Sequence, residues 1–83
     1  MYTLYILQCA DKTLYTGITV EMTRRLSEHN SSARGAKYTR ARRPVALRYT
    51  KLFKNRSLAS RAEARVKKMT RKEKLRLLNT PKI

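Results

Sequence analysis

Four side chains of different chemistry stand out in this sequence: Tyr5, Tyr15, Arg25 and Glu63. A phenol can orient or deprotonate a water molecule, and arginine is a planar, permanently charged donor that suits phosphate oxygens. A carboxylate oxygen is the kind of ligand that Mg²⁺ prefers, and Glu63 is one of only five acidic residues in a chain of 83. A phenol pair, a phosphate ligand and a metal ligand together predict the cleavage of phosphodiester bonds.

The distribution of charge indicates a polyanionic partner. Residues 1–33 carry three basic and three acidic residues, so the whole excess of +16 belongs to residues 34–83, where eighteen bases face Glu63 and Glu73. Such asymmetry is typical of nucleic-acid-binding proteins. An anionic membrane surface fits less well, because no long basic helix has a clean aromatic and leucine face. A basic surface without a specific partner is the plain alternative.

Length and composition bound the fold. We expect one domain, residues 1–83, with a small core. The single cysteine, Cys9, excludes an internal disulfide and a multi-cysteine zinc site, and we interpret it as a small apolar residue at the end of a strand. No stretch approaches the roughly 20 apolar residues of a membrane span. We therefore expect a cytoplasmic protein, a monomer in preference to an oligomer, with neither a membrane nor a small-molecule cofactor as partner.

The first half of the chain predicts a hairpin and a helix. Aromatic and β-branched residues predict two strands and the turn between them: residues 2–8, 13–18 and 10–12. Thr19 is a candidate N-cap for a helix with Glu21 in its first turn and its end near Asn30. Residues 31–44 predict a polar, basic loop.

The second half predicts one more strand and two helices. Apolar alternation predicts a strand over residues 45–53, with one face made by Val45, Leu47, Tyr49 and Phe53. Ser57 is a candidate N-cap for a helix with an apolar stripe of Leu58, Ala62, Val66 and Met69. Thr70 and Glu73 predict a capping box for a last helix that buries Leu75 and Leu78 and stops before Pro81. The predicted fold is α+β, a three-stranded antiparallel sheet flanked by helices in the order ββαβαα.

The helical period selects among the residues of the first helix. Met22, Leu26 and His29 share an inward face, Arg25 lies at its rim, and Arg24 points to solvent. Arg25 is therefore the arginine that can reach a pocket. Two structural alternatives remain open, because Arg25 can simply cover the core with its stem and His29 can be a packed core residue.

Glu63 and Gly17 have structural alternatives as well. Glu63 lies on the shoulder of an apolar stripe among positive charges, which favours its ionised form, but it can also form an ordinary helix pair with Lys67. Gly17 interrupts a predicted strand directly after Tyr15 and Thr16, which predicts a bulge or a close backbone approach. We interpret it as space for a phosphate.

Tyr5, the run Tyr15-Thr16-Gly17, Arg25, His29 and Glu63 occur in an order and spacing that resemble the GIY-YIG nuclease superfamily. The chain looks most like the small stand-alone bacterial subgroup (YhbQ/YazA-like, UPF0213), which is similar to the nuclease domain of Slx-type endonucleases. Residues 35–39 and 57–63 also look like that subgroup. The resemblance implies one divalent cation, Mg²⁺ or Mn²⁺, bound by Glu63. It also implies catalytic roles for both tyrosines, for Arg25 and for His29.

The sequence departs from the family pattern in four places. The first motif, Thr3-Leu4-Tyr5, lacks its glycine, and the second has Thr16 between its tyrosine and its glycine. Ile18 stands where some members have a lysine, so a lysine base is absent. Asn79 is the only downstream candidate for an asparagine that many members carry after the glutamate. Because the tyrosines carry the chemistry, the resemblance still implies hydrolysis to a 5′-phosphate product.

The substrate follows from the basic loop. One aromatic residue, Tyr38, lies among five basic ones: Arg34, Lys37, Arg40, Arg42 and Arg43. A basic groove with a stacking platform suits single-stranded or branched DNA. The rival hypotheses are a non-catalytic DNA- or RNA-binding module and a degenerate nuclease that serves in protein interaction. A binding module needs the basic half of the chain but neither Arg25 nor Glu63.

Overall fold

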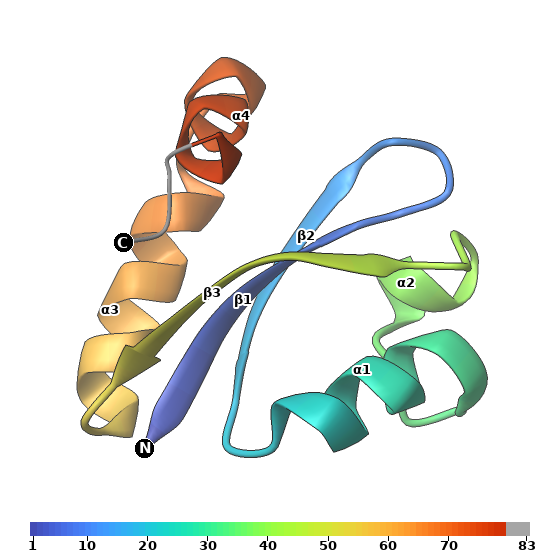
Figure 1. The fold of residues 1–83 in the computed structure, drawn as a ribbon, viewed down its shortest axis with the longest axis horizontal. Coiled ribbons are helices and arrows are strands. Elements are labelled where there is room, and N and C mark those ends of the chain that lie inside the picture. The colour runs from blue at the N-terminus through green and yellow to red at the C-terminus, as the bar shows by residue number, and fades with distance from the viewer. Residues whose placement is uncertain (80–83) are drawn as a thin grey trace.

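A computed structural model describes residues 1–79. The elements follow one another as β1 (Tyr2–Gln8), β2 (Leu14–Thr19), α1 (Met22–Ser31), α2 (Lys37–Arg40), β3 (Ala46–Phe53), α3 (Arg56–Lys67) and α4 (Arg71–Leu78). The strands form one antiparallel sheet in the order β2-β1-β3. Figure 1 shows α1 and α2 on one side of the sheet and α3 and α4 on the other. The predicted α+β class and three-stranded sheet are confirmed.

The central strand β1 supplies a core to both faces of the sheet, because successive side chains of a strand point to opposite sides. Tyr5 and Leu7 belong to a cluster on which Met22 and Leu26 of α1 pack. Leu4 and Ile6 belong to the other cluster, which joins the sheet to α3 and α4. The alternation of β1 thus separates an α1 layer from an α3–α4 layer.

Strand β3 corrects one prediction. Ile6 pairs with Tyr49 while Leu7 pairs with Leu47, so Arg48 is an extra residue in β3 and the register shifts there. An inserted residue inverts the alternation beyond it. Val45 therefore lies in the Tyr5 cluster, whereas Tyr49 and Phe53 pack on the Leu4 cluster. The single apolar face predicted for residues 45–53 is wrong.

Two predicted helix starts are also wrong. Glu21, not Thr19, is the N-cap of α1, so it lies before the first turn rather than in it; the Thr19 hydroxyl instead accepts a hydrogen bond from the Glu21 amide, at 3.2 Å. Asn55, not Ser57, caps α3 by accepting from the Leu58 amide at 3.0 Å. Asparagine and serine are both favoured N-caps, so the sequence cannot choose between Asn55 and Ser57. The choice depends on where the chain enters the helix.

The last helix begins as predicted, with a reciprocal capping box between Thr70 and Glu73. Leu78 packs on the Leu4 cluster, but the predicted burial of Leu75 is wrong, since it is exposed. Leu58 is likewise exposed, and the neighbouring Ala59 is buried in its place. An apolar stripe read from the sequence therefore predicts which face of a helix is buried only to within about one residue.

Residues 31–44, predicted as a loop, contain the short helix α2. Its residue Thr39 is fully buried, and Tyr38 packs on the Tyr5 cluster. The segment is therefore part of the α1 layer. Within residues 1–79, no helix is long and apolar enough to cross a membrane.

Candidate active site

Tyr5 and Gly17 face each other on neighbouring strands and form a matched pair. They pair directly in a regular antiparallel register, and Tyr5 is 1% exposed. A Cβ atom on residue 17 would lie 2.6 Å from Cζ of the Tyr5 ring. The expected close approach is confirmed, but the Tyr5 ring occupies the space that we had interpreted as a phosphate position, and no bulge occurs in this pairing.

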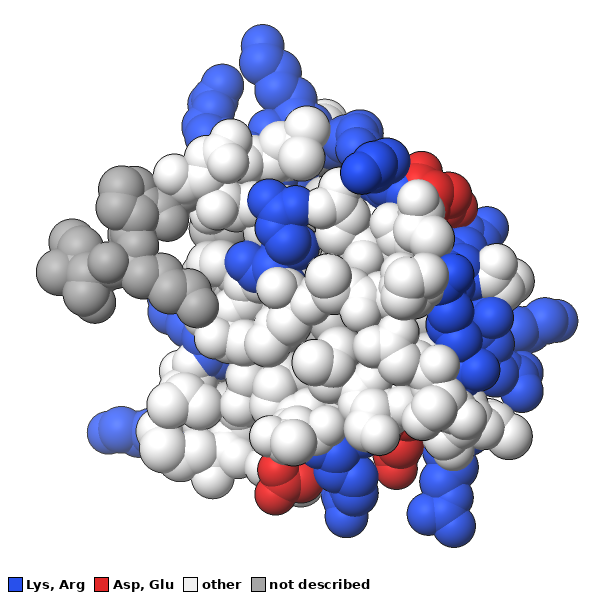
Figure 2. Space-filling view, turned by 45° about the vertical axis from the view of Figure 1, so that its right-hand side comes forward, with Lys and Arg blue, Asp and Glu red and all other residues white. Residues whose placement is uncertain are grey.

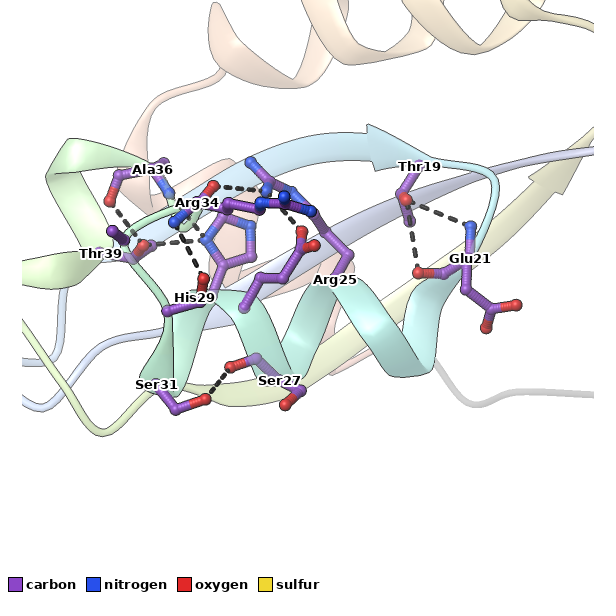
Figure 3. Close-up of polar contacts among 12 residues, drawn as sticks. Thr19, Glu21, Arg25, Ser27, His29, Ser31, Arg34, Ala36 and Thr39 are labelled. Carbon is purple, nitrogen blue, oxygen red and sulfur yellow. Dashed lines mark hydrogen bonds and ion pairs between the residues drawn. The ribbon is translucent and has the colours of Figure 1, made fainter.

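His29 is the polar centre of the site. Its ring is fully buried, and Nε2 lies 2.8 Å from the Tyr5 hydroxyl. On the other side Nδ1 lies 2.9 Å from the Thr39 hydroxyl oxygen and 3.3 Å from the Ala36 amide, which donates to it. Figure 3 shows the imidazole of α1 facing Ala36 and Thr39. The inward orientation predicted for His29 is therefore confirmed, and hydrogen bonds fix its ring on both edges.

Aromatic contacts complete the pocket wall. The Tyr15 ring meets the His29 ring edge-on at a centroid distance of 5.3 Å and lies 6.4 Å from the Tyr5 ring. Its other neighbour is the Tyr38 ring, stacked at 6.0 Å. The structure therefore brings both predicted tyrosines to the same histidine, with Tyr15 half-buried and Tyr5 buried.

Arg25 lies at the rim of this cluster, as predicted, while Arg24 is exposed. Nη1 of Arg25 donates to the Glu28 carboxylate at 2.9 Å and to the Arg34 carbonyl at 2.8 Å. The side chain remains 27% exposed. One nitrogen of the guanidinium is thus held by the protein, while the same side chain faces solvent at the site.

The site shifts the pKa values of its two buried groups away from the neutral range. Burial raises the pKa of Tyr5 to about 12, although nearby Arg25 opposes the rise. Burial lowers the pKa of His29 to about 4, and the charge of Arg25 acts in the same direction. At neutral pH the site therefore holds a neutral phenol and a neutral imidazole.

Glu63 of α3 lies on the opposite layer but acts on the same phenol, since its negative charge contributes to the raised pKa of Tyr5. Its side chain is 23% exposed, and the Lys67 ammonium lies 3.5 Å from a carboxylate oxygen. The alternative of a Glu63–Lys67 helix pair is thus realised in the structure. It does not exclude a role at the site, because Lys67 is itself exposed and can leave.

The donor set fits one hydrated hard cation better than a closed metal site. Residues 1–79 hold no group of three or more His, Cys, Asp or Glu side chains that could bind a metal together. Mg²⁺ often takes only one or two protein carboxylates and keeps several waters. A single partly exposed carboxylate, Glu63, meets that requirement.

The predicted nucleic-acid contacts of residues 34–43 divide into two groups. Arg43 donates to the carbonyls of Glu28, His29 and Ser32 at the end of α1. Arg42 binds Asp11 and the Tyr38 carbonyl, both at 3.0 Å, and its guanidinium lies 3.8 Å from the Tyr38 ring centroid. These three aromatic and basic side chains already have partners within the protein.

The other three, Arg34, Lys37 and Arg40, are exposed. Figure 2 shows basic side chains around much of the outline of one face, with few acidic ones between them. Exposed cations also occur on α3, on α4 and in the turn between them: Arg61, Lys72 and Lys68 are examples. The surface available to phosphates therefore extends beyond the predicted loop.

Thr39, Ala36 and Glu28 were not singled out by the sequence, although each contacts His29 or Arg25. The only signal was the likeness of residues 35–39 to the UPF0213 subgroup. Asn79 lies at the C-terminal end of α4, where its amide bonds to the Leu75 carbonyl. No hydrogen bond in the described part of the chain links it to the site.

Fold and site together define a nuclease-type domain, and comparison with known proteins agrees. The model of the GIY-YIG catalytic domain family matches residues 1–76, so the chain belongs to that family. A UPF0213 protein of Desulfotalea psychrophila is 58% identical over 86% of this chain and 66% of its own length. One of Syntrophus aciditrophicus is 54% identical over 89% of this chain and 85% of its own length.

Two solved structures share the fold. A UPF0213 protein of Bacillus halodurans is 42% identical, with a TM-score of 0.61 over 94% of this chain and 83% of that one. A protein of E. faecalis is 49% identical, with a TM-score of 0.64 over 93% of this chain and 81% of that one. The predicted resemblance to the family and to its UPF0213 subgroup is confirmed.

Proposed function

We propose that the protein is a divalent-metal-dependent DNA endonuclease that hydrolyses phosphodiesters in single-stranded or branched DNA. The observation that carries the proposal is the buried hydrogen bond between Tyr5 and His29, with the guanidinium of Arg25 beside it and the charge of Glu63 acting on the same phenol. A binding module has no need of a buried polar centre of this kind, whose burial costs folding free energy.

Each residue of the site has a distinct task in the proposal. Arg25 stabilises the charge on the phosphoryl oxygens in the transition state. Tyr5 orients the attacking water, since a phenol with a pKa of about 12 is neutral at working pH. Tyr15 packs the His29 ring in place. Glu63 would hold the cation, Mg²⁺ or Mn²⁺, which supplies Lewis-acid stabilisation of the scissile phosphate and the leaving oxygen.

The substrate contacts fall to exposed cations. We assign phosphate contacts to Arg34, Lys37 and Arg40, as the sequence predicted. We add two exposed residues, Arg61 of α3 and Lys68, which directly follows that helix. The Tyr38 ring already contacts Tyr15 and Arg42, so stacking on a DNA base would require Arg42 to move. We propose a preference for unpaired DNA because the loop is basic and because the Tyr38 ring can stack on a base once Arg42 moves off it.

The decisive experiment is cleavage of labelled single-stranded, branched and duplex DNA with Mg²⁺, Mn²⁺ or EDTA. We expect cutting only with metal. Glu63→Ala should abolish it while DNA binding persists or tightens, because a negative charge leaves the phosphate site. Cutting by Glu63→Ala at the wild-type rate would contradict the single-metal mechanism.

Adjacent arginines provide a matched pair of variants. Arg25→Ala should lower the cleavage rate by about 10²-fold or more, the scale of lost charge stabilisation in a transition state. Arg24→Ala should change it little, because Arg24 is exposed. Binding without cleavage by the wild-type protein would instead support the rival function, a nucleic-acid-binding module.

A further inference from the structure

Thr39 of α2 occupies a place that the proposed function does not explain. Its side chain is fully buried, and its hydroxyl donates to the Ala36 carbonyl at 2.8 Å while lying 2.9 Å from Nδ1 of His29. A carbonyl oxygen can only accept, and a hydroxyl has one hydrogen to give. When that hydrogen is directed to Ala36, the hydroxyl oxygen must accept at His29, so Nδ1 carries the imidazole hydrogen.

The consequence passes through the ring to Tyr5. A neutral imidazole has a hydrogen on one nitrogen only, so Nε2 is then an acceptor for the Tyr5 hydroxyl at 2.8 Å. Arg25 interacts with the same hydroxyl, but a guanidinium can only donate, so it does not compete for the phenol hydrogen. A buried tyrosine hydroxyl usually finds a partner, and His29 is the acceptor that the site provides.

One contact favours the opposite tautomer. The Ala36 amide donates to Nδ1 at 3.3 Å, which requires that nitrogen to be without a hydrogen. In that state Nε2 would donate to Tyr5, and the phenol hydrogen would have to turn away from His29. Thr39 and the Ala36 amide thus compete for one nitrogen. The Thr39 contact is the shorter of the two, at 2.9 Å against 3.3 Å for the amide.

We propose that Thr39 is a positioning residue that holds His29 in its Nδ1–H tautomer and thereby sets the direction of the Tyr5–His29 hydrogen bond. When the phenol hydrogen is donated to Nε2, the Tyr5 oxygen has a lone pair left and accepts a hydrogen bond from the attacking water. In the other tautomer the phenol would present its hydrogen, the wrong polarity for orienting a nucleophile. The catalytic consequence rests on the proposed nuclease function, whereas the tautomer does not.

The chain has a single histidine, so the imidazole ¹⁵N resonances of the labelled protein belong to His29 without further assignment. We expect long-range ¹H–¹⁵N spectra of the wild-type protein near neutral pH, without DNA, to show a protonated Nδ1 and a bare Nε2. Thr39→Val removes the hydroxyl at nearly constant shape. It should move the hydrogen to Nε2, because the Ala36 amide is then the only remaining partner of Nδ1.

Thr16→Val is the matched control. Thr16 is also buried, 4% exposed, and its hydroxyl has no hydrogen-bond partner within residues 1–79. This variant should leave the His29 spectrum unchanged. Thr39→Ser retains the hydroxyl and should keep the wild-type tautomer. If Thr39→Val does not fold, Thr39→Ala removes the same hydroxyl, and the wild-type spectrum by itself still tests the Nδ1–H tautomer.

Cleavage kinetics test the catalytic consequence. Thr39→Val should lower kcat by about 10²-fold, the cost of a misplaced reacting group, with KM for DNA little changed and Thr39→Ser near wild type. A wild-type protein with Nε2–H, or an unchanged tautomer in Thr39→Val, would overturn the proposal. So would a changed tautomer with an undiminished kcat. If the wild-type protein cuts no DNA, the nuclease proposal fails while the tautomer measurement still decides the role of Thr39.

Discussion

Residues 34–43 and the helices α3 and α4 have similar densities of positive charge but use it differently. In the former, Arg42 and Arg43 give their donors to Asp11 and to backbone carbonyls. On α3, on α4 and in the turn between them, the side chains of Arg61, Lys72 and Lys68 are exposed and have no polar partner within residues 1–79. A guanidinium whose donors are satisfied by the protein has little left for phosphate, so charge density alone does not identify a binding surface.

The difference extends to what each region does for the site. Residues 34–43 carry Ala36 and Thr39 to His29, Tyr38 to Tyr15, and the Arg34 carbonyl to Arg25. We call residues 34–43 the clamp segment. The helices α3 and α4 supply Glu63 and pack Val66, Leu77 and Leu78 on the other face of the sheet. Arg71 and Lys67 have partners within the protein, whereas other cations of these helices are exposed. We infer that the clamp segment mainly builds the site and that the two C-terminal helices contribute much of the affinity for DNA.

The largest expected effect is on stability, at Gly35. A Cβ atom there would lie 2.5 Å from the Glu28 carbonyl oxygen and 2.9 Å from Cα of His29. Both neighbours are backbone atoms, so Gly35→Ala must push the clamp segment away from α1, at a cost of about 3 kcal/mol. Chemical denaturation measures this cost. A stability within about 0.5 kcal/mol of wild type, as for an ordinary surface change, would show that the clamp segment is not tightly seated.

The next largest effect should be a loss of folding stability in acid, caused by protonation of His29, which contacts the clamp segment. The His29 pKa of about 4 lies below the ordinary value of 6.5, so the unfolded chain binds more protons and the contribution of neutral His29 is lost as pH falls from 6.5 towards 4. The loss should reach about 3 kcal/mol at the lower limit. Arg25, Glu28 and Arg43 are the charged groups that act on His29.

Denaturation at a series of pH values checks this expectation. His29→Gln keeps a neutral hydrogen-bonding side chain and should lose the dependence between those two pH values. An equal pH dependence in wild type and His29→Gln would assign the effect to the carboxylates instead.

Arg43→Ala should separate structure from binding within the clamp segment. It removes three hydrogen bonds to the carbonyls of Glu28, His29 and Ser32, which should cost about 1–3 kcal/mol, although Glu28 and Ser32 each keep a backbone donor. The salt dependence of DNA affinity should stay unchanged, because this guanidinium is already engaged. Arg40→Ala is the control, an exposed arginine of the same segment whose loss should affect stability little. If Arg43→Ala made the slope of log affinity against log salt shallower, Arg43 would be a phosphate contact after all.

The smallest effects should come from Arg61 of α3 and from Lys68, which directly follows that helix. Arg61→Ala and Lys68→Ala should each make the slope of log affinity against log salt shallower by about 0.7 for single strands if each removes one phosphate contact. Their stability should stay within about 0.5 kcal/mol of wild type. Lys37→Ala in the clamp segment provides the comparison. If the slope changed for Lys37→Ala alone, the DNA would contact residues 34–43, as the sequence had predicted. That result would contradict the inference that the C-terminal helices contribute much of the affinity.

The sequence by itself determined the three strands, the helices α1, α3 and α4 and the residues proposed for the site, but not the short helix α2. Aromatic and β-branched runs, the capping box at Thr70 and the helical period at Met22, Leu26 and His29 are local signals, because they depend on residues a few positions apart. They were sufficient for the sheet, for the order of the helices and for the choice of Arg25 over Arg24. The family motif added Tyr5, Tyr15 and Glu63.

The tertiary structure decided what depends on partners distant in sequence. The Tyr5–His29 hydrogen bond joins residues 24 positions apart, and Arg43 reaches carbonyls 11 to 15 positions away. An arginine in a basic run has the same local sequence whether its donors meet phosphate or a helix end. The shift of register at Arg48 and the burial of Thr39 likewise arise from packing against β1 and α1. No local pattern could therefore have shown that the apparent binding loop contributes side chains to the candidate site.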